Sequence, residues 1–392
     1  MSKILIFPWP EFGHLLPTLA LARELTTKGH QVIYLTAPQF NRYVTAVGAL
    51  IEPLCPQNAS EIPLSGSSLW YRHILDYGRD SHAIKFNNLV TTLVRNEKFS
   101  LVLCDHRLGR MCHRTVVTEA GNDHVISFST SLFDWGGPYE WSDPTIVFCP
   151  EEFELDKFRK QRCGVHYVES SLPPLEIDAD EPGLVIGDGP MIVVAFGTQS
   201  ARYRHIIELL LLVKELARRH SDLQFVVATG RHSHPELLRD IAELPNLTVR
   251  QRIPQRSLLQ RASVMITHGG CGSIKEAIYA GVPMIVLPML YDQPFNAMRV
   301  RHQGLGEAFF PGKYTLLALE AAVCDAVGGR YSSRLKRMQS QFIASENERR
   351  SSMFVTNWLA EAPKSGPRIN DFTDSRNAKS RVYENCSHLA IN

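Results

Sequence analysis

The sequence contains no apolar stretch long enough to cross a membrane. Its longest apolar zone, residues 277–290, is interrupted by one glycine and two prolines, whereas a membrane-spanning helix needs about 18 consecutive apolar residues. The apolar run near the N-terminus covers only residues 4–7 before Pro8 and Pro10 break it, which is shorter than the apolar core of a secretory signal. We therefore expect a cytoplasmic protein with no integral membrane segment.

A strong excess of either charge is also missing. The chain of 392 residues carries 42 basic and 40 acidic side chains, a net charge of +2, and no run of lysine and arginine. This balance argues against nucleic acid or an anionic membrane surface as a partner. No CxxC pair is present, so we expect reduced, mostly buried thiols rather than a disulfide framework. The eight cysteines are Cys55, Cys104, Cys112, Cys149, Cys163, Cys271, Cys324 and Cys386.

What the sequence does contain is an alternation of short apolar runs with amphipathic helical patterns. This rhythm predicts parallel sheets covered by helices. The predicted strands are residues 3–7, 31–36, 101–104, 124–128, 191–196, 223–229, 264–267 and 284–287. The predicted helices include residues 17–28, which begin at a proline and end before a glycine, and residues 203–220.

The alternation is interrupted once, where prolines and acidic residues concentrate between residues 172 and 190. Such a stretch is typical of an interdomain linker. We therefore predict an α/β protein with two doubly wound, Rossmann-like domains, each of ordinary size. The predicted parts are residues 1–172, a linker at 173–190, residues 191–362, and a polar C-terminal tail at 363–392.

The strongest chemical signal is the glycine-rich stretch 267–277, which follows a predicted strand and opens a predicted helix. Glycines let the backbone approach an anion, and the free N–H groups and dipole of the helix start favour negative charge there. The stretch has neither the ending of a Walker loop nor the spacing of a dinucleotide fingerprint. It predicts a diphosphate site to which the side chains of His268 and Ser273 add hydrogen bonds.

This stretch resembles the donor signature of the UDP-glycosyltransferase superfamily, the family 1 glycosyltransferases. The resemblance covers about residues 3–360 and also includes a short catalytic turn near the N-terminus. The matching elements are Gly13-His14-x-x-Pro17, Ile253-Pro254-Gln255, His268-Gly-Gly-x-Gly-Ser-x-x-Glu276, Gly281-Val-Pro283, Pro288 and Asp292-Gln293. The resemblance implies a GT-B fold, in which two Rossmann-like domains face a cleft and the second binds most of the nucleotide. The size and polarity resemble bacterial members that modify natural products.

The resemblance also implies the roles of the donor-binding residues. His268, Gly270, Gly272 and Ser273 meet the diphosphate, with Thr198 nearby; Glu276 holds the ribose; Asp292 and Gln293 hold the transferred sugar; Ile253 and Gln255 meet the base. One departure is Arg252, which stands where plant members have a tryptophan that stacks on uracil. An arginine plane can also stack, and both uracil and thymine remain open as the base.

Each of these residues also has a purely structural interpretation. Ser273 and Glu276 have the spacing of a helix capping box, which taken alone is favoured about two to one. Asp292 and Gln293 precede Pro294 and could cap a helix, and a lone His268 is more often structural. The joint spacing over 26 residues, from His268 to Gln293, favours the functional interpretation.

A predicted catalytic pair lies in the first half. An alcohol that attacks a sugar needs a base, and histidine suits this role near neutral pH. His14 follows the first strand, at the sheet edge where open α/β folds bind ligands. Asp105 follows another strand of the same predicted sheet and could fix the imidazole tautomer. For Asp105 a loop or cap role is about equally favoured.

Together these features predict an inverting hexosyltransferase. It would move a hexose, for which we expect glucose, from a UDP- or dTDP-sugar to a hydroxyl of a small, apolar natural product, with no metal or other cofactor. Asp178-Ala-Asp180 lies in the linker, and Cys104, His106, Cys112 and His113 fit no standard zinc spacing. Aromatic residues in 57–88 and 133–150 suit such an acceptor if they line a cleft, although a place in the core is the default interpretation. A nucleotide-sugar epimerase and a catalytically silent partner protein remain as alternatives.

Overall fold

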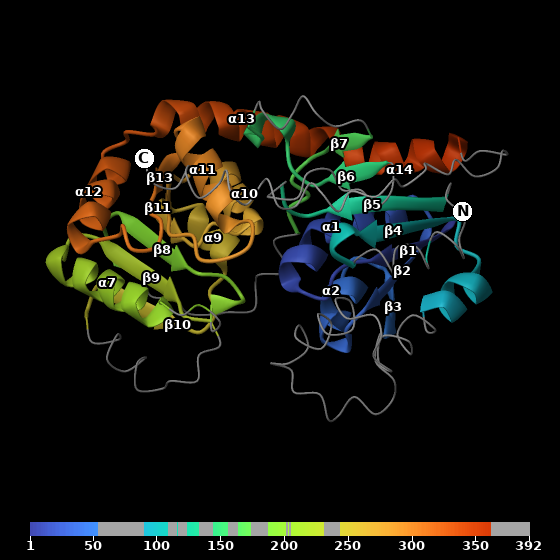
Figure 1. Cartoon of the computed structure of the whole chain (residues 1–392), viewed down its shortest axis with the longest axis horizontal. Coiled ribbons are helices and arrows are strands. Elements are labelled where there is room, and N and C mark those ends of the chain that lie inside the picture. The colour runs from blue at the N-terminus through green and yellow to red at the C-terminus, as the bar shows by residue number, and fades with distance from the viewer. Residues whose placement is uncertain are drawn as a thin grey trace, which may run out of the picture.

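Two parallel β-sheets, each flanked by helices, form the two halves of the protein (Figure 1). The computed structural model describes residues 1–53, 90–108, 116, 124–132, 144–155, 164–173, 187–200, 203, 205–230 and 244–361. Among these residues, seven strands form the first sheet and six form the second. The two doubly wound α/β halves predicted from the alternating pattern are thereby confirmed.

The first sheet has the strand order β3-β2-β1-β4-β5-β6-β7. Its strands are β1 (Lys3–Phe7), β2 (Gln31–Thr36), β3 (Leu50–Pro53), β4 (Leu101–Asp105), β5 (Val125–Ser129), β6 (Thr145–Val147) and β7 (Val165–Tyr167). The helical elements of this half include α1 (Phe12–Thr27), α2 (Asn41–Thr45) and the short 3-10 turns η1 (Pro38–Phe40), η3 (His106–Leu108) and η5 (Glu151–Phe153). The central strands β1, β4 and β5 are almost completely buried, as expected for a sheet covered on both faces.

The second sheet has the order β10-β9-β8-β11-β12-β13. Its strands are β8 (Met191–Ala195), β9 (Gln224–Ala228), β10 (Leu247–Arg250), β11 (Ala262–Thr267), β12 (Met284–Val286) and β13 (Gly306–Ala308). The described helices that follow Pro190 are α7 (Ile206–Arg219), α9 (Gln255–Leu259), α10 (Cys271–Ala280), α11 (Gln293–Gln303), α12 (Leu316–Val327), α13 (Ser332–Glu348) and α14 (Arg350–Glu361).

Both sheets reverse their strand order at one point. In the first sheet β1 pairs with β2 on one side and with β4 on the other, and in the second sheet β8 pairs likewise with β9 and β11. Connections leave in opposite directions at such a point, so a crevice opens at the carboxyl ends of the two central strands. The residues that follow β1, β4, β8 and β11 therefore lie where a ligand can bind.

Helix α1 begins earlier than the sequence pattern predicts. The expected helix starts at Pro17, because proline suits the first position of a helix. The observed helix starts at Phe12 and keeps Pro17 inside. Leu15, Leu19 and Leu25 of this helix are buried against the first sheet, and this burial offsets the hydrogen bond that Pro17 cannot make. The earlier start places His14 in the first helical turn rather than ahead of the helix.

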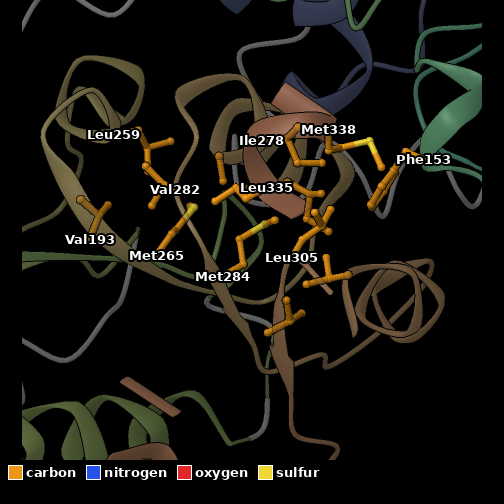
Figure 2. Close-up of a cluster of buried hydrophobic side chains, with 14 of the residues drawn as sticks. Phe153, Val193, Leu259, Met265, Ile278, Val282, Met284, Leu305, Leu335 and Met338 are labelled. Carbon is orange, nitrogen blue, oxygen red and sulfur yellow. The ribbon is translucent and has the colours of Figure 1, made fainter. Parts of the chain in front are cut away.

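The two halves share a continuous apolar core. Figure 2 shows Phe153, from η5 of the first half, beside Met338 of α13, with Leu335 and Ile278 of the second half close by. The rings of Phe153 and Phe342 also pack edge to face, with 6.3 Å between their centroids. The segment that follows β6 is therefore embedded in the second domain.

Two fully buried cations cross the same interface. The Nζ of Lys275 donates to the carbonyl oxygens of Phe148 and Ser170 at 2.8 and 3.2 Å. The Nε of Arg299 donates to a Glu154 carboxylate oxygen at 2.8 Å, and both of these side chains are fully buried. A buried charge is tolerated only with partners of this kind, so both cations are satisfied only while the two halves are in contact.

The C-terminal helices return to the first half. Helix α13 lies over the second domain, whereas α14 lies over the first (Figure 1) and contacts α1 there. Val355 of α14 is part of the core of the first domain, with Phe354 and Trp358 packed against it. Residues 350–361, which the sequence analysis included in the C-terminal domain, thus pack on the N-terminal one. An amphipathic helix shows in sequence that it has a partner, but not which one.

The buried Arg299–Glu154 pair predicts an asymmetric effect of mutation. Arg299→Met should cost about 3–5 kcal/mol, because it leaves the Glu154 carboxylate buried without its cation. Adding Glu154→Leu should recover most of this loss, since no uncompensated charge remains. Thermal melting of both variants measures the difference. Arg218→Met, which breaks an exposed pair with Glu215 on α7, should leave the melting temperature unchanged. A double variant less stable than the single one would contradict the prediction.

Candidate active site

The crevice of the first sheet holds a histidine–carboxylate pair. His14 lies in the first turn of α1, and Asp105 is the last residue of β4. The Nδ1 atom of His14 is 2.8 Å from Oδ2 of Asp105. The Asp105 side chain is completely buried, while the imidazole of His14 keeps 12% of its surface exposed. The structure thus brings together the two residues that the sequence analysis proposed as catalytic.

Asp105 is held by several hydrogen bonds. The backbone N–H of Trp9 donates to Oδ2 at 3.0 Å and that of Arg107 donates to Oδ1 at 2.9 Å. A second imidazole, His106, has its Nδ1 3.4 Å from Oδ1. Burial raises the pKa of the Asp105 carboxyl, but the charges and hydrogen bonds of His14 and His106 outweigh it and hold the pKa well below its usual range. Asp105 is therefore a carboxylate at any pH at which the protein works.

This arrangement fixes the orientation of the His14 ring. Because Nδ1 is turned toward the carboxylate, Nε2 is the nitrogen that can accept a proton from a substrate. The hydroxyl of Thr130, directly after β5, lies 3.3 Å from the same Nδ1. The sequence analysis missed Thr130, although its position after a strand of the same sheet was a signal that could have found it.

The crevice of the second sheet is built around His268. A carbon atom added to Gly197 would lie 2.6 Å from Cε1 and Nε2 of the imidazole, and one added to Gly270 would lie 2.5 Å from Nε2. Such distances are far inside van der Waals contact, so the ring fits only because both positions are glycine. Gly197 follows β8 and His268 follows β11, the two strands at the reversal point. Thr198 is exposed beside this ring site.

His268 is uncharged at neutral pH. Burial lowers the pKa of its imidazole to about 4, although the carboxylate of Asp292 and a backbone hydrogen bond to Ala195 act to raise it. The cation nearest in sequence, Lys275, is turned into the domain interface by its two carbonyl partners. Among the described groups of this motif, positive potential for an anion therefore comes from the start of α10.

The start of α10 has free backbone donors. The N-cap residue is Gly270, and no side chain makes a capping hydrogen bond. The N–H groups of the first turn, at residues 271–273, are thus left for an anion. The capping-box interpretation of Ser273 and Glu276 is wrong, because the helix begins at Cys271 and places both residues inside it. Gly272 has open space around its Cα.

Ser273 and Glu276 instead meet Gln255 of α9. The Nε2 of Gln255 donates to Oε2 of Glu276 at 2.6 Å and to Oγ of Ser273 at 3.2 Å. The resemblance assigned Gln255 to the nucleobase, whereas its side chain orients the carboxylate assigned to the ribose. Ile253, the other residue assigned to the base, packs partly buried against the apolar core.

The side chains of Asp292 and Gln293 differ in how many hydrogen bonds they make within the protein. Asp292 is the N-cap residue of α11, but its side chain caps no backbone N–H and accepts from the Asn296 amide at 2.8 Å. Gln293 is buried; its Oε1 accepts from the backbone N–H groups of Met289 and Leu290, both at 2.9 Å. Gln293 therefore shapes its own loop, and Asp292 is the better placed of the two to meet a sugar.

Tyr203 is a further residue that the sequence analysis missed. Its hydroxyl accepts from the Gln293 amide at 3.0 Å, and its ring lies 6.0 Å from that of His268. Burial raises the pKa of this phenol, the hydrogen bond from Gln293 lowers it, and the carboxylates of Asp292 and Glu11 raise it further. Glu11 directly precedes α1, so the start of α1 is close to the His268 site.

A second contact also joins the two crevices. The guanidinium carbon of Arg252, just past β10, lies 5.7 Å from the ring centre of Phe12, the first residue of α1. Arg252 itself is exposed. Phe12 is two residues from His14, so the histidine–carboxylate pair and the start of the second domain's ligand edge approach each other where the two domains meet.

Several sequence-based expectations lie outside the described residues. These are the Asp178-Ala-Asp180 motif, the aromatic segments 57–88 and 133–143, and the tail from residue 363. Within the described ranges no group of three metal-ligating side chains occurs, and no helix has both the length and the apolarity needed to span a bilayer.

Comparison with known proteins shows the kind of enzyme to which this fold belongs. The model of the glycosyltransferase family 28 C-terminal domain matches residues 191–352. The NDP-glycosyltransferase YjiC of Bacillus licheniformis is 27% identical over 380 residues, covering 86% of this chain and 92% of that protein. The chain is a glycosyltransferase with the GT-B fold.

Other relatives of this glycosyltransferase lead to the same conclusion. The oleandomycin glycosyltransferase of Streptomyces antibioticus is 25% identical over 432 residues, covering 97% of this chain and 95% of its own. The crystal structure of the glycosyltransferase of kitacinnamycin superposes with a TM-score of 0.73 at 21% identity, covering 91% of this chain and 99% of that one. At such identity the superposition shows the fold, and it confirms the predicted GT-B architecture. An epimerase or a silent protein is not favoured.

The close packing around His268 yields a prediction with a control on the same helix. Gly270→Ala should lower stability by about 1–3 kcal/mol, the usual range for overpacking, because the added carbon must displace the imidazole. The backbone of Gly270 has φ −61° and ψ 138°, so strain in the backbone does not contribute. Gly272→Ala, where nothing lies within 4 Å, should be neutral or stabilising by about 0.5–1 kcal/mol. Thermal melting that shows equal effects would contradict the packing argument.

Proposed function

We propose that this glycosyltransferase moves a hexose, with glucose as our first choice, from a UDP- or dTDP-sugar to a hydroxyl of a small, apolar natural product, with inversion at the anomeric carbon. The observation that carries the proposal is the 2.8 Å contact between His14 and Asp105, together with its place opposite the His268 site. One side of the gap thus holds a base, and the other holds donors for a leaving diphosphate.

In the proposed reaction His14 acts as the general base. Its Nε2 takes the proton of the acceptor hydroxyl while the oxygen attacks the anomeric carbon. The buried Asp105 carboxylate stabilises the imidazolium that forms and keeps the ring in place. The bond to the diphosphate breaks as the new bond forms, so attack from the opposite side turns an α-linked donor into a β-glycoside.

The leaving diphosphate is stabilised by the second crevice. Its developing charge meets the free N–H groups at the start of α10, which are fixed before the reaction begins. Gly272 and Ser273 belong to this group, and the N-cap Gly270, His268 and Thr198 lie beside it. No metal ion is needed for this charge, so we propose a metal-independent enzyme without other cofactors.

We propose that polar side chains around α10 bind the ribose and the sugar of the donor. Glu276, oriented by Gln255 at 2.6 Å, is placed to accept hydrogen bonds from ribose hydroxyls. Asp292 is placed to accept hydrogen bonds from hydroxyls of the transferred sugar. The Gln293 N–H that does not donate to Tyr203 can donate one more to the sugar. The base then extends toward Ile253 and Arg252, whose guanidinium plane can stack on either uracil or thymine.

The acceptor class follows from the relatives rather than from a described pocket. The oleandomycin glycosyltransferase and the glycosyltransferase of kitacinnamycin are both named for natural products. We propose an acceptor of the same kind, such as a polyketide, a macrolide or a carotenoid-like molecule.

The first test compares UDP-glucose with dTDP-glucose as donors for a panel of hydroxylated aromatic and macrolide acceptors. His14→Ala should lower kcat about 10²–10⁴-fold, the usual contribution of a general base, while calorimetry shows unchanged binding of UDP. Asp105→Asn should also lower kcat, because the imidazolium loses its carboxylate.

A matched control is His124→Ala. This histidine is half-buried in the same domain, and its Nδ1 contacts the Ser100 carbonyl at 3.0 Å, away from the crevice. It should retain normal turnover. Full transfer by His14→Ala would show that the base is wrongly assigned, and epimerised sugar without a glycoside would overturn the proposed reaction.

A further inference from the structure

The gap between the domains contains an arginine–aromatic contact that the proposed reaction does not yet use. Arg252 belongs to the second domain and Phe12 to the first, and the guanidinium carbon lies 5.7 Å from the ring centre. A guanidinium at this distance is attracted to the negative face of the ring. It joins the first residue of α1 to the segment that follows β10.

Phe12 is held rigidly in its place. Its ring packs edge to face on Phe40, with 5.0 Å between centroids and 83° between planes, and on Tyr43, with 5.4 Å and 87°. Phe40 is fully buried and Tyr43 nearly so. The Arg252 side chain is long and flexible, so Phe12 is the fixed partner of the pair and restrains the guanidinium.

A guanidinium plane has two faces, and Phe12 can cover only one of them. Arg252 is exposed, and it stands at the nucleobase position of the donor site. We propose that Phe12 is a positioning residue for the nucleobase: it packs on one face of Arg252 while the pyrimidine stacks on the other. This inference rests on the proposed function and deepens it.

With this arrangement, residues of both domains would form the subsite that binds the nucleobase. The partner that stiffens Arg252 is the first residue of α1, and His14 is the third. A bound pyrimidine would thereby restrain the helical turn that carries His14, the proposed proton acceptor. A tryptophan at this position would be rigid enough to stack without support. The flexible arginine side chain needs a neighbour such as Phe12 to fix its orientation.

The test measures binding of UDP and of inorganic pyrophosphate, which lacks the base, to the full chain by calorimetry. Phe12→Leu and Arg252→Lys should each weaken UDP binding about fivefold, which is the size of effect expected for one cation–π contact. Both variants should leave pyrophosphate binding unchanged. Phe12→Tyr keeps the aromatic face and should bind UDP normally. The double variant should be no worse than Arg252→Lys alone, because the two residues act as one unit.

Arg250→Lys is the matched control. This exposed arginine lies two residues away and donates to the carbonyl of Val249, so its replacement should leave UDP binding unchanged. Equal loss of UDP and pyrophosphate in Phe12→Leu would show a general disturbance of α1 and overturn the inference, as would additive losses in the double variant. A wild-type chain that binds neither UDP nor dTDP would instead refute the proposed donor class.

Discussion

The reversal of strand order in each parallel sheet is the constraint on which the rest of the site depends. Connections that leave β1 and β4, or β8 and β11, in opposite directions open a crevice at their carboxyl ends. His14 and Asp105 follow or end the first two strands, and Gly197 and His268 follow the other two. Residues about 90 positions apart in the first half meet at 2.8 Å for this reason alone.

The buried charges between the domains add a second constraint, on how the crevices stand relative to each other. Lys275 belongs to the helix whose start forms the anion site, yet its ammonium is bound by carbonyl groups of the first domain. A shift of that helix that breaks these two hydrogen bonds while the ammonium stays buried would cost several kcal/mol. The anion site is thus tied to the domain that carries the proposed base.

Much of this could be predicted from the sequence, because strands, glycine turns and a long motif leave local signals. The doubly wound halves and the pairing of His14 with Asp105 followed from such signals. Pro17 misled the prediction of the start of α1, since apolar burial outweighed the local cost of an internal proline. The true partner of Glu276 was also hidden: Gln255 lies 21 positions away, and only the packing of α9 on α10 brings them together. No local pattern encodes a contact of that kind.

In the proposed reaction, the neutrality of His268 in the free protein bears on how the leaving diphosphate is stabilised. Burial holds the pKa of His268 near 4, so this imidazole offers a hydrogen bond rather than a charge, and Lys275 is bound by carbonyl groups of the first domain. The remaining source of positive potential among these groups is the uncapped start of α10. Backbone N–H groups need no proton from solution and do not reorganise as charge develops. Gly197 and Gly270 matter here because they lack a side chain. Their small size leaves room for the neutral imidazole of His268 to pack close to the start of α10.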